Sequence, residues 1–432
     1  MKKIIFSGLL LFSFNVMIAQ DLKKAKNLLD SKQLDKAKNE IDGFTAKNPT
    51  NAEGLYVKSK VYGSIATNDQ FKALDPNARA TAYDAFRQAV DLDKDNKLLL
   101  VLTQDQYKPI IDLYSGYYDA GVADFNTAAT SQNKADFEKA MSNFIKANEV
   151  GRYIYGKKWA LSEIDTALVF NIGKAALNAD KKDTAAVYFK MLADKGITGT
   201  KDGSTGYNLP YQWLALSYKD AKDSTNFLKY AALGKKNFPK DDYFDAITLD
   251  YYRAAKNYDA LFARYSDVVA AYPDSMTYHF NYANEMFNYV YNSDAGVKID
   301  NREERLKTVG AELEKAYGMK ADDVNTNWLY SQYYFNAGID LKEQANKVKG
   351  TKPEDVKAKA DFNAQAKTSF EKALPYGEKA LTSLEAGFKK EEKSKYKSVA
   401  DLMQRIYQSL NQADKVKSYQ TKYDTADAKF VN

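Results

Sequence analysis

The sequence predicts an all-α protein, an α-solenoid of about eight helical hairpins. The clearest hairpin is residues 242–275, where apolar side chains recur at helical spacing on both sides of a break at Lys256 and Asn257. Its length of 34 residues falls in the range of tandem helical repeats. A triplet of alanine, phenylalanine and alanine, spaced four and then three residues, recurs at 82/86/89, 140/144/147 and 366/370/373. A repeated small-aromatic-small stripe lets neighbouring helices approach closely, as stacked hairpins require.

The repeat units follow one another along nearly the whole chain. They are expected near residues 21–51, 52–97, 98–150, 166–199, 207–240, 242–275, 276–320, 325–385 and 394–425, with a tail at 426–432. Three of them end next to a proline, at Pro49, Pro239 and Pro273. Proline cannot continue a helix, so these positions mark hairpin ends.

Several segments interrupt the regular pattern. Pro109 lies within a long apolar pattern and is expected to start or kink a helix there. The charged segment 341–359 is predicted as a solvated helix pair with a turn, and 387–397 as a turn or an exposed helix end.

Residues 1–19 are predicted to be a secretory signal peptide. Lys2 and Lys3 precede the apolar run from Ile4 to Phe14, and cleavage is expected after Ala19. No later segment is apolar enough to cross a membrane, so the mature chain is expected to have no transmembrane segment. Export predicts a periplasmic, extracellular or outer-membrane-associated protein, and the absence of cysteine leaves no residue for a lipid anchor.

The composition argues against several classes of function. The chain has no cysteine and one histidine, which leaves no thiolate nucleophile, no Cys or His metal cluster and no Ser-His-Asp triad. We therefore predict no enzyme activity, no metal and no cofactor. The formal net charge of +6 is mild and spread out, so nucleic acid is not expected as a partner.

Two loops resemble ligand-binding motifs incompletely. Residues 91–96 alternate aspartates as a calcium-binding loop does, but Leu102 stands where that loop needs its closing glutamate. Residues 196–206 combine glycines, hydroxyls and Lys201, yet the order is not that of a phosphate-binding loop, and no strand precedes it. Both are interpreted as turns between repeats.

Isolated polar residues give no stronger indication of a reaction. His279 lies in an aromatic helix and is expected to be a packed or surface side chain. The adjacent pairs Glu303 and Glu304, and Glu391 and Glu392, point in different directions on a helix, so neither forms an acid/base pair.

The chain resembles the tetratricopeptide repeat (TPR) family. The resemblance rests on Trp328 near the start of a first helix, on Ile172 and Gly173 within another, on the three alanine–phenylalanine–alanine triplets and on the terminal prolines. It implies a right-handed superhelix whose first helices line a concave groove that holds another protein or a peptide. An unrelated α-solenoid is the structural alternative.

By the same resemblance, groove-facing positions can be assigned on the first helix of each hairpin. Tyrosine and arginine are frequent among such binding anchors, although aromatics at helical spacing also pack between hairpins. The candidate groove residues are Tyr56, Lys60, Lys174, Tyr211, Tyr218, Tyr243, Asp250, Arg253, Asn284, Phe287, Tyr333 and Asn336.

The favoured functional hypothesis is an exported, non-enzymatic scaffold for protein–protein interaction in a bacterial envelope or secretion complex. The alternative is an outer-membrane-associated protein that binds glycans or nutrients, because the chain has 33 tyrosines and sugars stack on exposed rings.

Overall fold

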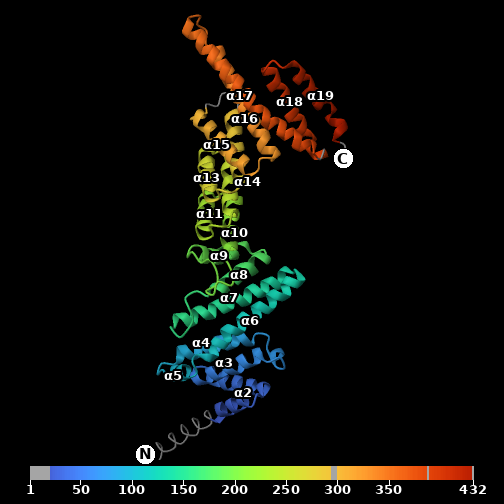
Figure 1. Cartoon of the computed structure of the whole chain (residues 1–432). Coiled ribbons are helices and arrows are strands. Elements are labelled where there is room, and N and C mark those ends of the chain that lie inside the picture. The colour runs from blue at the N-terminus through green and yellow to red at the C-terminus, as the bar shows by residue number, and fades with distance from the viewer. Residues whose placement is uncertain (1–19, 293–298, 387–388, 431–432) are drawn as a thin grey trace, which may run out of the picture. The chain divides into compact units, whose positions relative to one another are not determined.

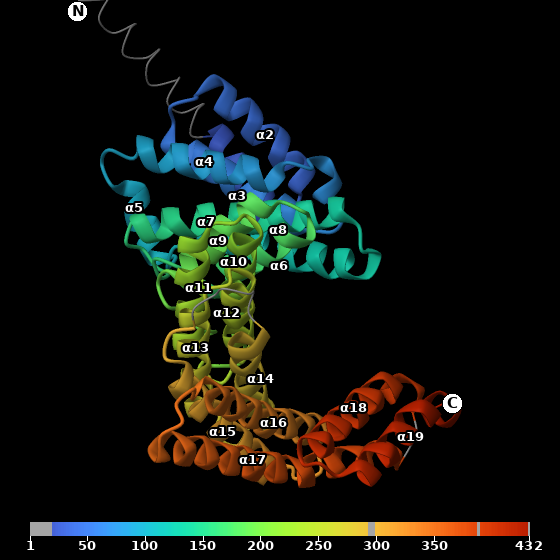
Figure 2. The same cartoon turned by 90° about the horizontal axis from the view of Figure 1, so that it is seen from above.

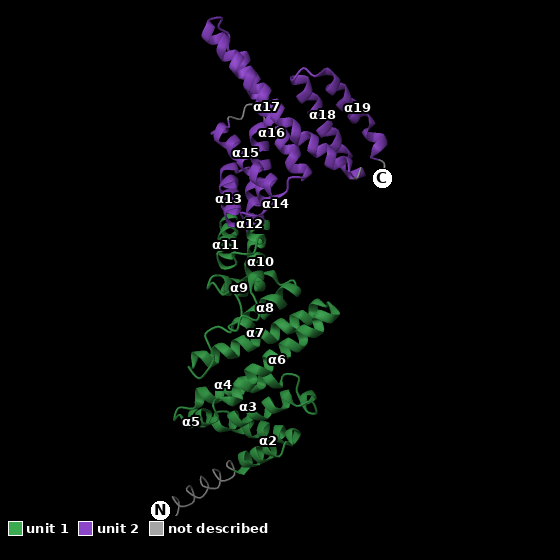
Figure 3. Ribbon diagram, in the orientation of Figure 1, with its two compact units in different colours: residues 1–244 green, residues 245–432 purple. Residues whose placement is uncertain are grey.

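The computed structural model describes residues 20–292, 299–386 and 389–430. The predicted signal peptide, residues 1–19, lies outside these described residues. Helices make up the regular structure of the described chain, apart from an isolated bridge between Gly199 and Gly206. The chain divides into two compact units, residues 1–244 and 245–432 (Figure 3), and each is described by itself.

Unit 1 is a series of helices that pair with their neighbours along the chain (Figure 1). The pairs are α3 with α4, α6 with α7, α8 with α9, and α10 with α11, and α6 also contacts α3 and α4 (Figure 2). The helical segments are 20–30, α2 (Leu34–Lys47), α3 (Ala52–Thr67), α4 (Ala78–Leu92), α5 (Lys97–Gln104), α6 (Lys108–Ser131), α7 (Lys134–Gly156), α8 (Thr166–Asn178), α9 (Lys182–Ala193), α10 (Asn208–Asp220), α11 (Ser224–Asn237) and the first residues of α12 (Tyr243–Ala254).

Unit 2 repeats the same scheme with longer helices. Its pairs are α14 with α15, α16 with α17, and α18 with α19, and the paired ends of α16 and α17 project from the rest of the unit (Figure 1). Its helices are the remainder of α12, α13 (Tyr258–Ala271), α14 (Met276–Asn292), α15 (Arg302–Met319), α16 (Val324–Lys347), α17 (Pro353–Glu385), α18 (Lys393–Ser409) and α19 (Ala413–Lys429). This sequence of hairpins confirms the predicted all-α fold class.

Short polar side chains define where many of the helices begin. Asn51 and Asp165 each accept a hydrogen bond from a backbone N–H in the first turn of the following helix, α3 and α8. The same contact starts other helices, with Asn133, Asp223, Asn257 and Asp323 as the capping residues. Each such cap satisfies a helix N–H that has no partner within the helix and stabilises the helix by about 1 kcal/mol.

Phenylalanine rings pack neighbouring helices together by occupying the space next to a glycine on the facing helix. A Cβ atom on Gly173 of α8 would lie 2.2 Å from the ring of Phe189 on α9, and one on Gly338 of α16 would lie 2.5 Å from Phe370 on α17. Equivalent contacts join Gly54 to Phe44, Gly121 to Phe144 and Gly234 to Phe244. All three alanine–phenylalanine–alanine triplets are buried, as the sequence predicted, because this packing needs small residues around the ring.

The structure settles one boundary that the sequence left open and changes another. Pro109 stands in the first turn of α6, where its missing N–H costs nothing, so it starts that helix rather than kinking one. The expected tail at 426–432 is not free over its described part. Instead, α19 continues to Lys429, and the buried ring of Phe430 lies 4.9 Å from that of Tyr396.

The charged segments contain helix ends and the turns between them, so 341–359 is a helix pair with a turn, as predicted. Residues 348–352 form the turn between α16 and α17, and α18 begins at Lys393, after the short 3-10 turn Lys390–Glu392. Among the described residues, no helix has the length and apolar character needed to span a membrane.

Candidate functional site

The first helices of unit 2 form a groove of about 640 Å³, which we call the unit 2 groove. Helix α14 contacts α16, and α16 contacts α18, so the first helices of three successive hairpins lie side by side. The lining residues are Phe287, Asn292, Trp328, Gln332, Phe335, Asn336, Ser394, Lys397, Ser398, Asp401, Leu402, Arg405 and Tyr423.

Helical spacing explains why these side chains share one surface. On α16, Trp328, Gln332 and Asn336 are four residues apart, so they project from the same face of the helix. On α18, Lys397, Asp401 and Arg405 repeat the same interval. The groove is therefore framed by two rows of side chains from neighbouring first helices.

The unit 2 groove combines an apolar floor with polar groups that are not used internally. Phe287 and Phe335 are each 3% exposed, and Leu402 is 5% exposed. The side-chain amides of Gln332 and Asn336 make no hydrogen bond to another described residue. The half-buried Trp328 and the exposed Tyr423 supply accessible ring surface beside these amides. Such a combination suits an extended peptide, whose backbone presents N–H and C=O groups to both sides.

Charged groups at the groove differ in how far they are neutralised. The Lys397 ammonium donates to Asp427 at 2.6 Å, and this hydrogen bond raises the pKa of Lys397. Arg405 lies with its guanidinium 4.9 Å from the ring centre of Phe335 and forms no ion pair with any described carboxylate. Asp401, on the same helix, also has no ion-pair partner in the described chain.

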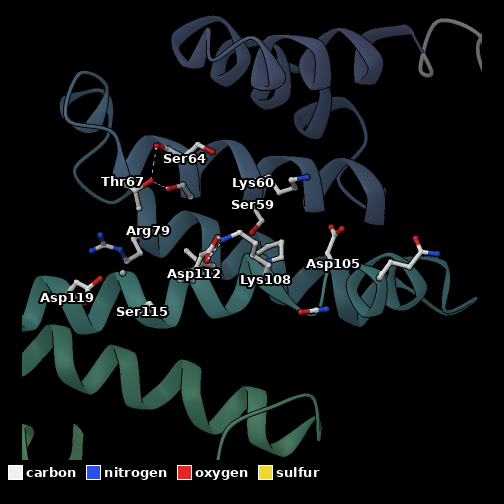
Figure 4. Close-up of a pocket in the computed structure, with 16 residues that line it drawn as sticks. Ser59, Lys60, Ser64, Thr67, Arg79, Asp105, Lys108, Asp112, Ser115 and Asp119 are labelled. Atoms are coloured by element: carbon white, nitrogen blue, oxygen red, sulfur yellow. Dashed lines mark hydrogen bonds and ion pairs between the residues drawn. The ribbon is translucent and has the colours of Figure 1, made fainter. Parts of the chain in front are cut away.

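Unit 1 contains a groove of about 660 Å³ with a different lining (Figure 4), which we call the unit 1 groove. It lies between α3 and α6, with Arg79 of α4 and the residues between α5 and α6 also contributing. Its lining residues are Ser59, Lys60, Gly63, Ser64, Thr67, Arg79, Gln104, Asp105, Gln106, Lys108, Pro109, Asp112, Leu113, Ser115, Gly116 and Asp119.

Small, hydroxyl-bearing and charged residues dominate the unit 1 groove. Lys108 pairs with both carboxylate oxygens of Asp112 at 2.7 Å. The Arg79 guanidinium lies 5.2 Å from the ring centre of Tyr117. Burial lowers the pKa of Arg79, and Tyr117 and Asp119 oppose that shift only in part. No aromatic ring lines this groove, and its apolar surface comes from aliphatic groups such as those of Leu113 and Pro109.

Next to the unit 1 groove lies a second cavity of about 750 Å³ that shares Lys60 and includes Tyr56. Helix α5 borders it with Leu98 and Val101. Three consecutive residues of α5 are exposed large hydrophobic side chains: Leu99, Leu100 and Val101.

The structure brings some of the predicted groove residues together. Phe287 and Asn336 both line the unit 2 groove. Lys60 lines the unit 1 groove, and its ammonium lies 5.8 Å from the ring centre of Tyr56. Tyr56 itself is 5% exposed, and its hydroxyl donates to Asp105 at 3.4 Å, so it mainly packs within unit 1.

Other predicted groove residues of unit 1 are engaged in packing. Tyr211 is fully buried, and its hydroxyl donates to the carbonyl of Ile197 at 3.0 Å, so this ring does not reach a groove. Tyr218 stacks on Tyr230 at 5.5 Å, and the Lys174 ammonium lies over the rings of Phe125 and Phe170. Tyr243 is half-buried, and burial raises its pKa.

The remaining candidates of unit 2 make contacts within the unit. Arg253 pairs with Asp250 and Glu285 and donates to the Tyr265 hydroxyl at 3.0 Å, so it links α12 to α13 and α14. Asn284 accepts from the Asn288 side chain at 3.3 Å. The Tyr333 hydroxyl packs against Gly310, where an added Cβ would lie 2.8 Å away.

Sequence reasoning missed the contribution of α18 to the unit 2 groove. The four-residue spacing of Lys397, Asp401 and Arg405 could have indicated it, but no groove residue was predicted on the first helix of this last hairpin. Arg79 was missed because it lies on a second helix, α4, and reaches the unit 1 groove from there.

The loops that resemble ligand-binding motifs have structural roles. The Asp93 carboxylate accepts from the backbone N–H of Leu99 at 2.9 Å, so it caps α5. In the 196–206 loop, Asp202 accepts from the Ser204 N–H at 3.1 Å, which tightens the turn between the bridged Gly199 and Gly206. No cluster of His, Asp and Glu able to hold a metal occurs among the residues that the structure describes.

His279 is a buried structural residue. Its ring is 2% exposed, its Nδ1 is paired with the Glu312 carboxylate, and its Nε2 lies 3.0 Å from the carbonyl oxygen of Pro273. Glu312 also accepts from Lys315 at 2.9 Å. This network joins α14, α15 and the loop that follows α13.

Comparison with known proteins supplies structural neighbours only. No family model matches the sequence, and no curated protein does. Solved structures that align with the chain include a human IFIT1 dimer with m7Gppp-AAAA, at 15% identity over 86% of this chain and 90% of that one, with a TM-score of 0.24.

Two further neighbours are described as repeat proteins. The P58(IPK) TPR domain aligns at 14% identity over 83% of this chain and 98% of that one, with a TM-score of 0.25. A circular tandem repeat protein aligns at 9% identity over 96% and 95%, with a TM-score of 0.20. Such scores support no detailed overlay. The packed hairpins and their glycine–phenylalanine contacts show independently that the chain has a TPR-like, helical-repeat fold.

Proposed function

We propose that this protein is an exported, non-enzymatic scaffold that binds a segment of another protein in the unit 2 groove. The observation that supports this most is the composition of that groove. A buried apolar floor at Phe287, Phe335 and Leu402 lies beside the unused amides of Gln332 and Asn336. Partners of such surfaces bury side chains in the floor and hydrogen-bond their backbone to the walls.

The aromatic content of the chain gives less support to glycan binding. Tyr155 and Tyr423 are the aromatic residues found among the exposed large hydrophobic side chains of the described chain. Most other rings stack on or pack against one another, as Tyr330 does with Tyr376 at 4.3 Å. Few rings are therefore open for a sugar to stack on.

Site-specific photocrosslinking in the producing cell tests the scaffold function. A photoreactive phenylalanine analogue at position 336 faces the unit 2 groove, and one at the exposed Lys367 on α17 is the matched control. We expect one crosslinked protein at position 336 that is missing at position 367. Equal patterns at both positions, or no crosslink at position 336, would contradict the proposal.

Export forms the second part of the proposal, and it is supported by the sequence of residues 1–19. N-terminal sequencing of the chain recovered from the envelope fraction should start at Gln20. Recovery of the chain only from the cytoplasm with Met1 retained would contradict export while leaving the binding groove untouched.

A further inference from the structure

We infer that the unit 2 groove selects an extended peptide segment in which a side-chain carboxylate stands next to an apolar side chain. This inference rests on the proposed function and specifies the chemistry of its partner. It is based on the state of Arg405, on the apolar floor beside it and on the distribution of charge along the chain.

Arg405 is held in the groove without a carboxylate partner. Asp401 lies one helical turn before it on α18, at the spacing where an ion pair commonly forms, yet the two do not pair. The guanidinium instead lies 4.9 Å from the ring centre of Phe335. Stacking on a ring fixes the plane of the guanidinium and leaves its N–H groups directed outward for a planar acceptor.

The surroundings of Arg405 specify what lies next to that acceptor. Phe335 lies beneath the guanidinium and, like Leu402, is almost fully buried, whereas the half-buried Trp328 and the exposed Tyr423 give the groove apolar surface that a partner can reach. Asn336 supplies a donor and an acceptor for the backbone of the bound segment. A carboxylate and an apolar side chain on neighbouring residues therefore satisfy the cation and the floor together.

The unit 2 groove offers one unpaired cation to a carboxylate. Lys397, the other cation of the groove, is already paired with Asp427 at 2.6 Å. One guanidinium matches one carboxylate with two parallel hydrogen bonds. Because the carboxylate of a chain end has the same planar geometry, blocked peptide ends are needed to test a side-chain carboxylate alone.

The net positive charge of the chain comes from its C-terminal part, which includes α18. Residues 341–432 contain 19 lysines and arginines and 13 acidic residues, a net charge of +6, which equals the net charge of the whole chain. Residues 1–340 are therefore neutral overall. A positive C-terminal region attracts an acidic segment and raises its rate of association.

Fluorescence anisotropy with labelled, terminally blocked peptides tests the inference. The probes are three repeats of Gly-Phe-Glu, and the same peptide with Gln or with Lys in place of Glu. At low salt we expect the Glu probe to bind about tenfold more tightly than the Gln probe, with the Lys probe weakest. The preference should shrink in high salt because part of it is long-range attraction.

Variants locate the selectivity at one residue. Arg405→Gln should reduce the Glu-over-Gln preference to less than about twofold, whereas Arg405→Lys should keep part of it. Lys417→Gln, an exposed residue of α19 outside the groove, removes the same charge and should leave the preference unchanged. Both positions are exposed, so circular dichroism should show folded proteins.

Three outcomes would overturn the inference. Equal binding of the Glu and Gln probes would remove the acidic selectivity while leaving a peptide-binding scaffold intact. An unchanged preference in Arg405→Gln would place the selectivity elsewhere. Displacement of the Glu probe by a nine-residue thymidine oligonucleotide at lower concentration than by unlabelled Glu peptide would identify a nucleic-acid site instead. Failure of every peptide to bind, together with no crosslink at position 336, would contradict the proposed function itself.

Discussion

The grooves of the two units are built from equivalent helices but differ in chemistry. In unit 1, serine, threonine and glycine line the space between α3 and α6, and its charges include the closed Lys108–Asp112 pair. In unit 2, aromatic rings form the floor and Arg405 remains unpaired. The accessible rings at the unit 2 groove, Trp328 and Tyr423, are of the residue types that anchor many protein interfaces, and the unit 1 groove has no such ring.

The difference shows that the two units share a way of packing their hairpins but not the side chains that line their grooves. Both units use the same glycine–phenylalanine contact to hold a hairpin, at Gly173 with Phe189 and at Gly338 with Phe370. The side chains that line the two grooves differ, although Phe335 of the unit 2 groove also packs against the Phe370 ring at 5.7 Å. The comparison can be tested by changing first the shared scaffold and then the features that differ.

The largest effects are expected at the shared scaffold. Phe189→Ala in unit 1 and Phe370→Ala in unit 2 should each lower the free energy of unfolding by about 4 kcal/mol, because a fully buried ring is lost and a cavity remains. Urea unfolding gives the magnitude. Hydrogen exchange with mass spectrometry should show the loss of protection mainly in the unit that carries the substitution. Equal loss in both units would contradict their independence.

A smaller loss of stability is expected when a buried ion pair of unit 2 is broken. The acidic residues buried in the described chain, Asp245 and Glu312, both belong to unit 2. His279→Ala should cost about 3 kcal/mol, because Glu312 keeps only Lys315 as a partner. Lys315→Ala is the control, since this half-exposed lysine should contribute less than about 1 kcal/mol. Thermal unfolding of both variants checks the order, and a larger loss in Lys315→Ala would refute it.

Binding should depend on the wall amides of unit 2 and not on the hydroxyls of unit 1. Asn336→Ala should weaken binding of the Gly-Phe-Glu probe about fivefold, which corresponds to the loss of one hydrogen bond of about 1 kcal/mol. Ser64→Ala, which removes a hydroxyl from the unit 1 groove, should change the affinity by less than about twofold. Anisotropy titrations of both variants measure the two losses of affinity. A larger loss in Ser64→Ala than in Asn336→Ala would place the binding site in unit 1.

The smallest expected effect is a pH dependence that the two units share. Burial raises the pKa values of Asp42 and Glu385, but hydrogen bonds from lysine and tyrosine outweigh it, so both carboxyl groups have lowered pKa values. Asp42 accepts from Tyr62 at 2.7 Å, and Glu385 accepts from Tyr396 at 2.7 Å. These groups therefore stabilise the fold above their unfolded pKa of about 4, and the contribution is lost as the pH falls through the lower folded pKa.

The corresponding variants are Asp42→Asn and Glu385→Gln. Each should cost up to about 1 kcal/mol at pH 7, and the difference from the parent chain should disappear below about pH 3. Urea midpoints measured across this pH range test the sign. A difference that grows in acid would mean that burial, which raises the pKa, dominates instead.

The helices could be predicted from sequence because their information is local. The alanine–phenylalanine–alanine triplets and the terminal prolines repeat at intervals that a single chain displays. Phe430 could not be placed in this way. It follows a polar helix without a clear apolar period, and its burial depends on Tyr396, which comes from the preceding helix of the hairpin.

The groove could be predicted only in part. Phe287 and Asn336 were found because they occupy first-helix positions, and both line the unit 2 groove. Tyr211 occupies such a position too, but its hydroxyl finds a partner in the Ile197 carbonyl inside unit 1. Arg405 could not be recognised as a free cation, because that status depends on which carboxylates lie within reach in three dimensions.

The glycine–phenylalanine contacts also have a consequence for mechanical load. The Phe189 ring occupies the space that a Cβ atom on Gly173 would fill. Such a contact fixes how far one helix can shift along the axis of the other. A chain pulled from its ends should therefore lengthen in discrete steps of one hairpin, because two helices joined by this contact come apart before one can slide along the other. A chain with such contacts would stay rigid up to a threshold force and then unfold one repeat at a time.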